Sequence, residues 1–291
     1  MRKSLYAGLA VLLAAVVPAV PANAVHAYQN YVALGDSFTA GPQIPEQRLD
    51  PAGCHRSSAN YPSLLAELLV ARSAVDASCS GADTTHLTQP QEVGDDMNPP
   101  QLSALRPETD LVTVGLGGND YNLFQRIVET CPVLRAQNPT GAPCRQYFTV
   151  NGSDTLRAIV TQTEGNLTDS LRRVRERSPK ARVLAVGYPR IVPASGFCGA
   201  ILPFADGDYA WIADLEAALA GAIANAAAAS GSSYVDVHGP SLGHDACAQG
   251  GSAWVNGAVD RDDAARFHPV RAGMQGVSGL IYAHLQNPTL T

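Results

Sequence analysis

The sequence from residue 31 to residue 41 reads Tyr-Val-Ala-Leu-Gly-Asp-Ser-Phe-Thr-Ala-Gly. Its four leading residues are typical of a short buried strand, which Gly35 interrupts. Asp36 and Ser37 follow where a helix can begin, and Gly41 permits a tight turn. Free N–H groups and the helix dipole at such a turn can stabilise a developing oxyanion. Alone, the pattern favours a simpler interpretation, in which Asp36 or Ser37 merely caps a helix.

Strand-like and helix-like patterns alternate along the rest of the chain. Short apolar runs typical of buried strands occupy 75–79, 111–116, 182–186 and 234–237. Apolar residues at helical spacing occupy 61–71, 156–174 and 211–223, and a last helical pattern follows His268-Pro269. This alternation indicates a parallel sheet covered by helices on both faces. We expect a single α/β domain with three α/β/α layers around a central parallel sheet of about five strands.

The first 24 residues have the pattern of a secretory signal peptide. Arg2 and Lys3 form a basic start, and the apolar run from Leu5 to Val17 is too short to span a bilayer comfortably. A small-x-small cleavage site ends at Ala24, and a second possible site ends at Ala27. An uncleaved anchor is the alternative. We expect cleavage, secretion, and a mature domain of residues 28–291 that does not insert stably into a membrane.

The charge balance limits the partners of this protein. The formal net charge is −6 and becomes more negative once Arg2 and Lys3 are removed with the signal peptide. This balance argues against nucleic acid and against an anionic membrane surface as electrostatic partners. It leaves neutral lipids and esters open, and we expect a monomer that acts on a small-molecule or lipid ester.

Six cysteines follow the signal peptide, and an even number in an exported chain favours disulfides. None lies in a Cys-x-x-Cys pattern, so neither a zinc site nor a redox dithiol is expected. Cys131 and Cys144 flank a short segment containing proline and glycine, which indicates a locally closed loop. Sequential pairing, with three separate loops, is favoured among the fifteen formal possibilities.

Chemically useful groups follow the predicted strands, and the carboxyl ends of parallel strands share one edge of the sheet. Gly35-Asp36-Ser37 follows the first strand, Ser80-Gly81-Ala82-Asp83 the second, and Gly117-Gly118-Asn119-Asp120 the third. His268 lies just before the last helix. A hydroxyl nucleophile, a glycine N–H, an asparagine amide and an imidazole are therefore expected to converge.

With these four blocks the chain resembles GDSL-type esterases and lipases of the SGNH hydrolase superfamily, and most closely their secreted actinobacterial lipases. The resemblance runs from Tyr31 to the last helix, and the blocks at 35–37 and 117–120 are specific in combination. It implies the flavodoxin-like SGNH fold. It also implies the disulfides Cys54–Cys79, Cys131–Cys144 and Cys198–Cys247.

The resemblance also implies a role for each block. Ser37 would attack an ester carbonyl to form an acyl-enzyme, and His268 would act as its base and then as the acid. The N–H groups of Ser37 and Gly81 and the amide of Asn119 would form the oxyanion hole, each donor contributing ~3 kcal/mol. Neither a metal nor an organic cofactor is needed. The carboxylates of Asp36 and Asp120 are expected to tie loops together.

One position departs from the family pattern. The family usually has an aspartate three residues before the histidine, where this chain has Ala265. Asp262 and Asp263 are nearby but wrongly spaced. Some relatives orient the histidine with a main-chain carbonyl, which fixes the tautomer but stabilises the imidazolium less than a carboxylate would. We expect a Ser–His dyad whose histidine is oriented by the backbone carbonyl of Ala265 or of a neighbour.

Three alternatives remain open from the sequence. His238 and His244 follow the fifth predicted strand and rival His268 as the base, although the His-Pro pair before the last helix favours His268. The same machinery could serve a carbohydrate acetyl esterase. A secreted binding protein that has lost turnover is less favoured, because neither the nucleophile nor an oxyanion donor is missing.

Overall fold

Five parallel strands form the central sheet, in the order β2-β1-β5-β8-β9. The computed structural model describes residues 28–287, so the predicted signal peptide (1–24) and the second possible cleavage site at Ala27 lie outside the described residues. The order is the flavodoxin-like winding, and the predicted fold class is confirmed. The five strands are β1 (Asn30–Gly35), β2 (Ser73–Asp76), β5 (Leu111–Gly115), β8 (Arg182–Val186) and β9 (Ser233–Val235).

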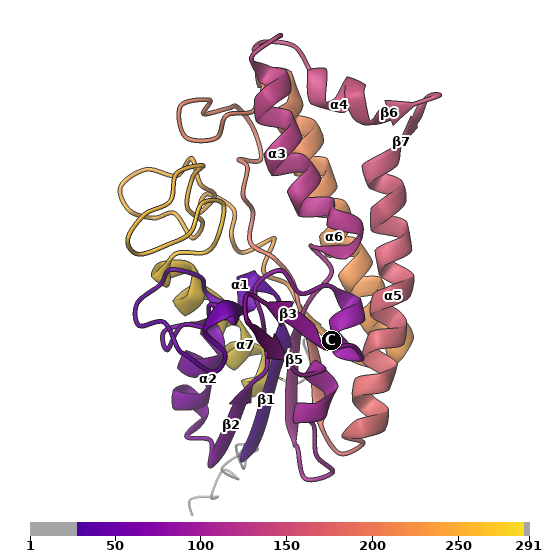
Figure 1. The fold of residues 1–291 in the computed structure, drawn as a ribbon, viewed down its shortest axis with the longest axis vertical. Helices are drawn as coiled ribbons and strands as arrows, with labels where there is room; N and C mark the ends of the chain where they lie inside the picture. Colours follow the sequence, from indigo (N-terminus) through magenta and orange to yellow (C-terminus); the bar gives the residue numbers. More distant parts are fainter. Residues whose placement is uncertain (1–27, 288–291) are drawn as a thin grey trace, which may run out of the picture.

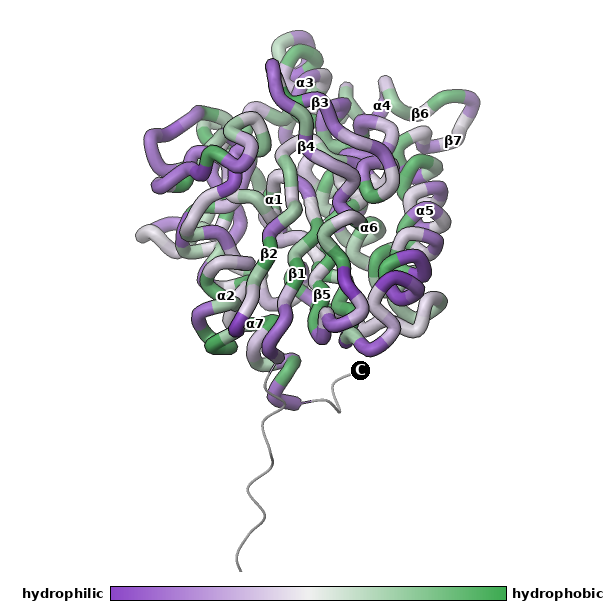
Figure 2. The backbone as a smooth tube through the Cα atoms, turned by 60° about the horizontal axis from the view of Figure 1, so that its bottom comes forward, coloured by the Kyte–Doolittle hydropathy of each residue, from purple (hydrophilic) through white to green (hydrophobic). Residues whose placement is uncertain are grey.

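Helices cover both faces of this sheet, as Figure 1 shows. The helices α2 (Tyr61–Leu69) and α7 (Arg271–Gln286) pack on one face, and α5 (Thr155–Arg177) and α6 (Tyr209–Ser230) on the other. Side chains of β1 alternate accordingly, since Leu34 packs with α5 and α6 while Tyr31 packs with α2 and α7. The mostly apolar colour of β1 and β5 in Figure 2 reflects this burial on both faces.

The register of the strands brings their carboxyl ends to one level. Gly35 at the end of β1 pairs with Gly115 at the end of β5. The edge strand β2 ends at Asp76, earlier than the predicted end at Cys79, and its side chains are largely exposed, so their pattern marks the strand poorly. Beyond the end of β2 the chain still runs alongside β1, because the N–H of Cys79 donates to the carbonyl of Gly35 at 3.0 Å. Gly81 is thereby delivered to the same edge.

A third apolar cluster lies beyond the sheet, where α3 (Leu123–Arg135) and α4 (Pro143–Phe148) pack on the first turns of α5 and α6. The sequence patterns predicted neither α3, which contains Pro132, nor the short α4. The other elements are α1 (Ser37–Ala40), β3 (Gln91–Val93), β4 (Asp96–Asn98), β6 (Thr149–Val150), β7 (Ser153–Asp154) and the 3₁₀ turns η1 (Ala52–Cys54), η2 (Thr84–Leu87), η3 (Gln101–Ala104), η4 (Asp120–Asn122) and η5 (Asp206–Asp208).

The helix α6 has an apolar composition that the fold explains. Within residues 28–287, the stretch Asp206–Ser230 is the one helical segment long and apolar enough to cross a membrane by length and composition. In the structure, Trp211 and Leu215 are buried in the third cluster, and Ile223 packs with α5 and the sheet. One face of α6 therefore serves the core.

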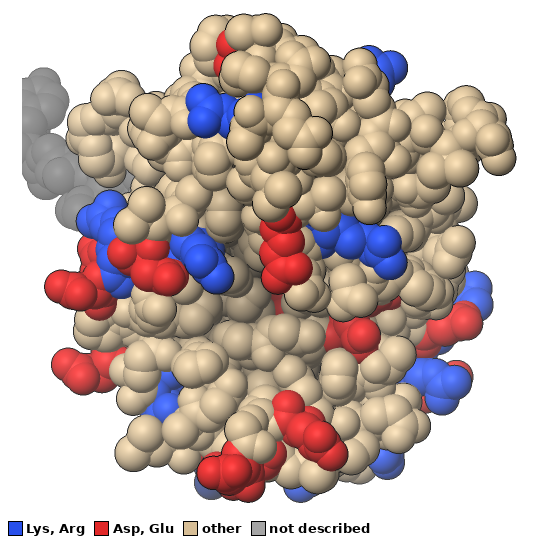
Figure 3. All heavy atoms as spheres, turned by 45° about the horizontal axis from the view of Figure 1, so that its top comes forward, with Lys and Arg blue, Asp and Glu red and all other residues tan. Residues whose placement is uncertain are grey.

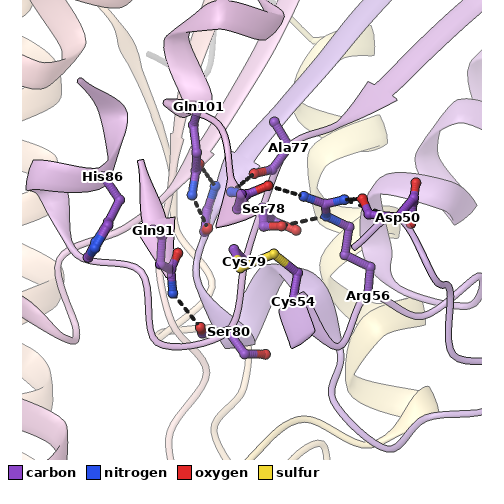
Figure 4. The surroundings of a disulfide bond; sticks show 12 residues. Asp50, Cys54, Arg56, Ala77, Ser78, Cys79, Ser80, His86, Gln91 and Gln101 are labelled. Carbon is purple, nitrogen blue, oxygen red and sulfur yellow. Dashed lines mark hydrogen bonds and ion pairs between the residues drawn. A yellow bond between two sulfur atoms is a disulfide. The ribbon is translucent and has the colours of Figure 1, made fainter. Parts of the chain in front are cut away.

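Three disulfides join Cys54 to Cys79, Cys131 to Cys144 and Cys198 to Cys247, and these are the pairs that the resemblance implies. The first lies beside the turn that carries Gly81, as Figure 4 shows. In that turn the N–H of Ser80 donates to the carbonyl of Cys54 at 3.0 Å, and Gln91 Nε2 donates to the carbonyl of Ser80 at 2.8 Å. The turn is thus anchored on two sides.

Candidate active site

Ser37 is the first residue of α1, directly after β1 and its connecting Asp36. The carboxylate of Asp36 caps the helix by accepting from the N–H of Phe38 at 2.9 Å, and the N–H of Asp36 donates to the carbonyl of Gly115 at 3.0 Å. A Cβ at Gly35 would lie 2.1 Å from Thr39 Oγ1, so this tight turn requires glycine. The turn places the serine hydroxyl at the helix N-terminus, over the edge of the sheet.

His268 lies against Ser37, with 2.8 Å between His268 Nε2 and Ser37 Oγ. On the other side of the ring, Nδ1 lies 2.7 Å from the carbonyl oxygen of Arg266. A carbonyl oxygen can only accept a hydrogen bond, so Nδ1 carries the proton and Nε2 is free to accept from the serine hydroxyl. This is the tautomer that a general base needs.

The residue that orients the histidine differs from the expected one. The carbonyl of Ala265, predicted for this role, instead accepts from the N–H of His268 at 3.2 Å and from Asn256 Nδ2 at 3.1 Å. Phe267 adopts a left-handed backbone, with φ of 59°, and the chain turns between Arg266 and His268. The carbonyl next to Ala265, that of Arg266, therefore faces the ring, and Ala265 is corrected to Arg266.

Two aromatic rings pack against the histidine and make its surroundings apolar. The ring centroids of Phe38 and Phe124 lie 5.3 Å and 5.6 Å from that of His268. Burial lowers the pKa of His268 below its usual value, and the hydrogen bond to Arg266 opposes this only in part. The imidazole is therefore neutral, and basic, at neutral pH.

The predicted oxyanion donors meet on the same side of Ser37. Ser37, Gly81, Asn119 and His268 all line one open depression of about 750 Å³. Gly81 has a left-handed backbone, with φ of 80°, which favours glycine at this turn. One N–H of the Asn119 side chain donates to the carbonyl of Ala82 at 3.0 Å, which fixes the amide and leaves its second N–H for a ligand.

Asp36 and Tyr188 tie two of the converging loops together. The hydroxyl of Tyr188 donates to Asp36 Oδ2 at 2.5 Å and accepts from the N–H of Gly118 at 3.0 Å. Burial raises the pKa of Asp36 to about 7, although the bonds from Tyr188 and Phe38 oppose the rise. The loop after β1 is thus connected to the loop after β5.

Asp120 makes the corresponding connection to the Gly81 turn. Its carboxylate accepts from the N–H of Thr84 at 2.9 Å, from the Thr84 hydroxyl at 2.7 Å and from Asn166 Nδ2 at 2.9 Å. Burial raises the pKa of Asp120 as well. Because Asp120 adjoins Asn119, this network also holds the backbone that carries Asn119, a predicted oxyanion donor. Both aspartates join loops, as expected.

The rival histidines are placed elsewhere. His244 stacks on Trp254 with 4.9 Å between ring centroids, and its Nδ1 lies 2.6 Å from the carbonyl of Ser252. His238 is buried and lines a pocket, but the structure gives it no contact with Ser37. Asp263 is exposed and pairs with Arg261 at 3.0 Å. The structure therefore brings His268, of the three histidine candidates, to the serine.

Sequence reasoning missed several residues of this site. Tyr188 follows β8 at its carboxyl end, so the rule that placed the other groups could have found it. Phe124, Asn256 and Arg266 lie outside that rule, because they come from a helix and a loop that no strand pattern marks. The main chain of Arg266, rather than its side chain, contacts His268.

A second pocket, which is apolar and partly open to solvent, also reaches Ser37. It lies between α3 and α6, which run side by side in Figure 1. Its apolar wall includes Leu123, Phe124, Ile127, Ile212, Leu215 and Leu219. A pocket of this kind suits a hydrocarbon group whose reactive carbon lies at the serine. Among the described residues, no cluster of acidic, histidine or cysteine side chains could hold a metal ion.

Comparison with known proteins agrees with this geometry. The sequence pattern of the GDSL-like Lipase/Acylhydrolase family matches residues 33–275. Lipase 2 of Streptomyces coelicolor is 38% identical over 260 residues, covering 88% of this chain and 85% of that protein. The crystal structure of phospholipase A1 from Streptomyces albidoflavus is similar with a TM-score of 0.73 and 27% identity, over 88% of this chain and 99% of that one.

The extracellular lipase of Streptomyces rimosus has the same fold, with a TM-score of 0.73 and 24% identity over 88% of this chain and 99% of that one. The family pattern thus covers most of the chain, from β1 into the last helix. The chain belongs to the GDSL-like lipase/acylhydrolase family, and it is a lipase or esterase.

Proposed function

We propose that the protein is a secreted carboxylic ester hydrolase that works through an acyl-enzyme on Ser37, with His268 as its base. The observation that carries this proposal is the 2.8 Å contact between Ser37 Oγ and His268 Nε2, combined with a carbonyl at Nδ1. It supplies a nucleophile, a base and a group that orients the base. A lost nucleophile would have favoured a non-catalytic binding protein instead.

In the first half-reaction the serine oxygen attacks the ester carbonyl. Its proton moves to His268 Nε2 as the new carbon–oxygen bond forms. The carbonyl oxygen becomes an oxyanion, which accepts from the N–H groups of Ser37 and Gly81 and from the Asn119 amide. His268 then gives its proton to the leaving alcohol as the ester bond breaks, and the acyl group remains on Ser37.

In the second half-reaction a water molecule takes the place of the alcohol. His268 removes one of its protons, the resulting hydroxide adds to the acyl carbon, and the same donors hold the oxyanion. The bond to Ser37 Oγ breaks, the serine recovers its proton from His268, and the carboxylic acid leaves. Neither half-reaction draws on a cofactor.

The two pockets that meet at Ser37 assign the two parts of the substrate. His268 lines the open depression of about 750 Å³ and not the apolar pocket, and it must reach the leaving oxygen. The alcohol therefore occupies the depression, and the acyl chain enters the apolar pocket. A hydrocarbon wall favours lipid esters over sugar acetates, whose acyl group is a single methyl. Charges of both signs are interspersed on the face drawn in Figure 3, with broad uncharged areas between them, which suits a neutral substrate.

Secretion rests on three observations. The first 24 residues have the pattern of a signal peptide. Three disulfides are typical of proteins that fold in an oxidising compartment. The similar lipase of Streptomyces rimosus is described as extracellular. We also propose that the monomer is active, since one chain supplies every group of the site.

Covalent labelling and a chain-length series test the proposal together. An organophosphonate ester should label Ser37 alone, and Ser37→Ala should lose labelling and several orders of magnitude in kcat/KM. p-Nitrophenyl esters with longer acyl chains should be hydrolysed faster than the acetate. Labelling at another residue, or full activity in Ser37→Ala, would contradict the mechanism. Preference for acetylated sugars over all acyl chains would instead favour the carbohydrate esterase.

A further inference from the structure

The apolar pocket contains two polar side chains that the proposed mechanism does not use. Glu216 comes from the middle of α6, and His238 comes from the segment after β9. Both line the pocket together with the aliphatic and aromatic residues of α3 and α6. A pocket that only had to hold a plain hydrocarbon chain would need neither of them.

Glu216 is bound by the protein on one oxygen only. Its Oε1 accepts from the N–H groups of Ile191 at 3.1 Å and Val192 at 3.3 Å, which fixes the carboxyl group. Its Oε2 is buried, with no hydrogen-bond partner among the described residues. Burial raises the pKa of Glu216 to about 8, although the N–H groups of Ile191 and Val192 and the charge of Arg190 oppose the rise.

His238 presents a second unpartnered atom. The side chain is 8% exposed, and its Nε2 is buried without a hydrogen-bond partner in the part of the chain that the structure describes. Burial, and secondarily the charge of Arg190, lowers the pKa of His238, so its ring is neutral at pH 7. The loop is fixed nearby, because Ser241 Oγ donates to the carbonyl of His238 at 2.9 Å.

Two unsatisfied buried groups in one pocket carry a cost. An unpaired buried polar group destabilises a fold, and native structures contain few of them. A ligand that supplies the missing hydrogen bonds removes this cost on binding. The complementary ligand group both donates and accepts, because the atoms without partners are a carboxyl oxygen and an imidazole nitrogen. A hydroxyl group has these properties, whereas a carboxylate would have to be buried as a charge.

We infer that the pocket is specific for acyl chains that carry a hydroxyl group away from the ester, and that Glu216 and His238 bind this hydroxyl. The inference rests on the proposed function, because it needs the ester carbonyl to be held at Ser37. It adds a substrate class, the esters of hydroxy fatty acids, and two residues that determine specificity. The chain between ester and hydroxyl packs on the apolar wall of α3 and α6.

The test compares matched pairs of p-nitrophenyl esters, one with a plain acyl chain and one with a hydroxyl moved stepwise along the same chain. In the full mature protein, kcat/KM for the hydroxy ester should exceed that for the plain ester by roughly tenfold at one or two positions, the scale of one satisfied buried hydrogen bond. Glu216→Leu should remove this preference, so that the hydroxy ester and the plain ester are hydrolysed with equal kcat/KM. Glu216→Gln, which still forms hydrogen bonds, should keep part of the preference.

Asp214→Leu is the matched control, because it removes an exposed carboxylate from the same helix and should leave the preference unchanged. His238→Leu gives an independent second arm and should also reduce the preference, so the inference stays testable if Glu216→Leu does not fold. Equal rates for every hydroxy and plain pair in the unmodified protein would overturn the inference and leave only water at the two side chains. Failure of the proposed function is distinct, since then neither ester would be hydrolysed and Ser37 would not be labelled.

Discussion

The active site has a serine half, formed by Ser37, Gly81 and Asn119, and a histidine half, formed by His268 and its loop. Different kinds of contact hold the two halves in place. Ser37, Gly81 and Asn119 follow strands of one sheet, and two buried aspartates, Asp36 and Asp120, connect their loops. His268 comes from a loop before α7, and its nearest partner is a main-chain carbonyl. The buried carboxylates of this site therefore support the scaffold of the serine half, and none touches the histidine.

The loop of the histidine half is held by the side-chain amide of Asn256. Asn256 Nδ2 lies 2.8 Å from the carbonyl of Val259 and 3.1 Å from those of Ala264 and Ala265, and the N–H of Asn256 donates to the carbonyl of His268 at 2.9 Å. The side chain is 7% exposed. The loop is also tied to the serine half, because the N–H of Ala265 donates to the carbonyl of Pro42 at 3.2 Å.

The difference between the contacts of the two halves indicates what His268 would require as the proposed base. A carboxylate behind the histidine would orient the ring and stabilise the imidazolium, whereas a carbonyl mainly orients it. The carboxylate whose charge acts on the ring is that of Asp260, and it raises the pKa of His268 less than burial lowers it. In the proposed mechanism the loop therefore serves His268 mainly by orienting its ring, and the two halves can be tested by separate substitutions.

The largest expected effect is that of His268→Ala. Without this ring the serine has no base, so kcat/KM for a p-nitrophenyl ester should fall by ~10⁴-fold. Circular dichroism should show an intact fold. Retention of more than a few per cent of the activity would show that His238 or His244 can serve as the base.

Asn119→Ala tests the serine half at its oxyanion hole. Loss of one preorganised donor should reduce kcat by ~10²–10³-fold with little change in KM, because the donor acts mainly on the transition state. Asn225→Ala is the control, since that side chain lies on α6 and donates to Glu164 at 3.1 Å. An equal loss in both variants would point to a general defect in folding.

Asn256→Ala tests the histidine half. The loop would lose three hydrogen bonds from one side chain, and a small displacement of the ring can cost ~10²-fold in rate. Phosphonate labelling of Ser37 should slow in parallel with kcat, because both reactions need the base. A lower melting temperature with an unchanged labelling rate would mean that Asn256 is structural only.

The pH dependence of kcat/KM reports the environment of the base. Protonation of His268 removes its basic form, so the rate should fall as pH decreases through the pKa, by tenfold for each further unit. Burial lowers this pKa, so the midpoint should lie below the usual value of 6.5. A profile on p-nitrophenyl acetate between pH 4 and 8 measures it, and a midpoint above 6.5 would indicate an unrecognised carboxylate behind the ring.

The same comparison explains how much of the site the sequence could predict. Ser37, Gly81 and Asn119 follow strands of a parallel sheet, so the strand pattern and the topology together placed them at one edge. The acceptor for His268 could not be assigned in this way. Every residue has a carbonyl, and the choice between Ala265 and Arg266 depends on the left-handed turn at Phe267, which neither composition nor periodicity marks. Similarly, Pro132 interrupts the helical pattern of α3, so the sequence did not predict this helix. One wall of the apolar pocket, which α3 forms, was therefore not predicted either.

The smallest expected effects are those of Asp262→Ala and Asp263→Ala. Both side chains are exposed, Asp263 is paired with Arg261, and the Nδ1 atom of His268 already has its acceptor in the carbonyl of Arg266. Each variant should therefore keep kcat/KM within about tenfold, which corresponds to ~1.4 kcal/mol of transition-state stabilisation. Asp260→Ala should fall between these variants and Asn256→Ala, because Asp260 Oδ1 accepts from the N–H of Arg266 at 2.9 Å and so supports the acceptor itself. A loss of ~10³-fold in Asp262→Ala or Asp263→Ala, with the fold intact, would identify that residue as the third member of a displaced triad. The histidine half would then be held by a carboxylate after all, and the contrast between the two halves would be wrong.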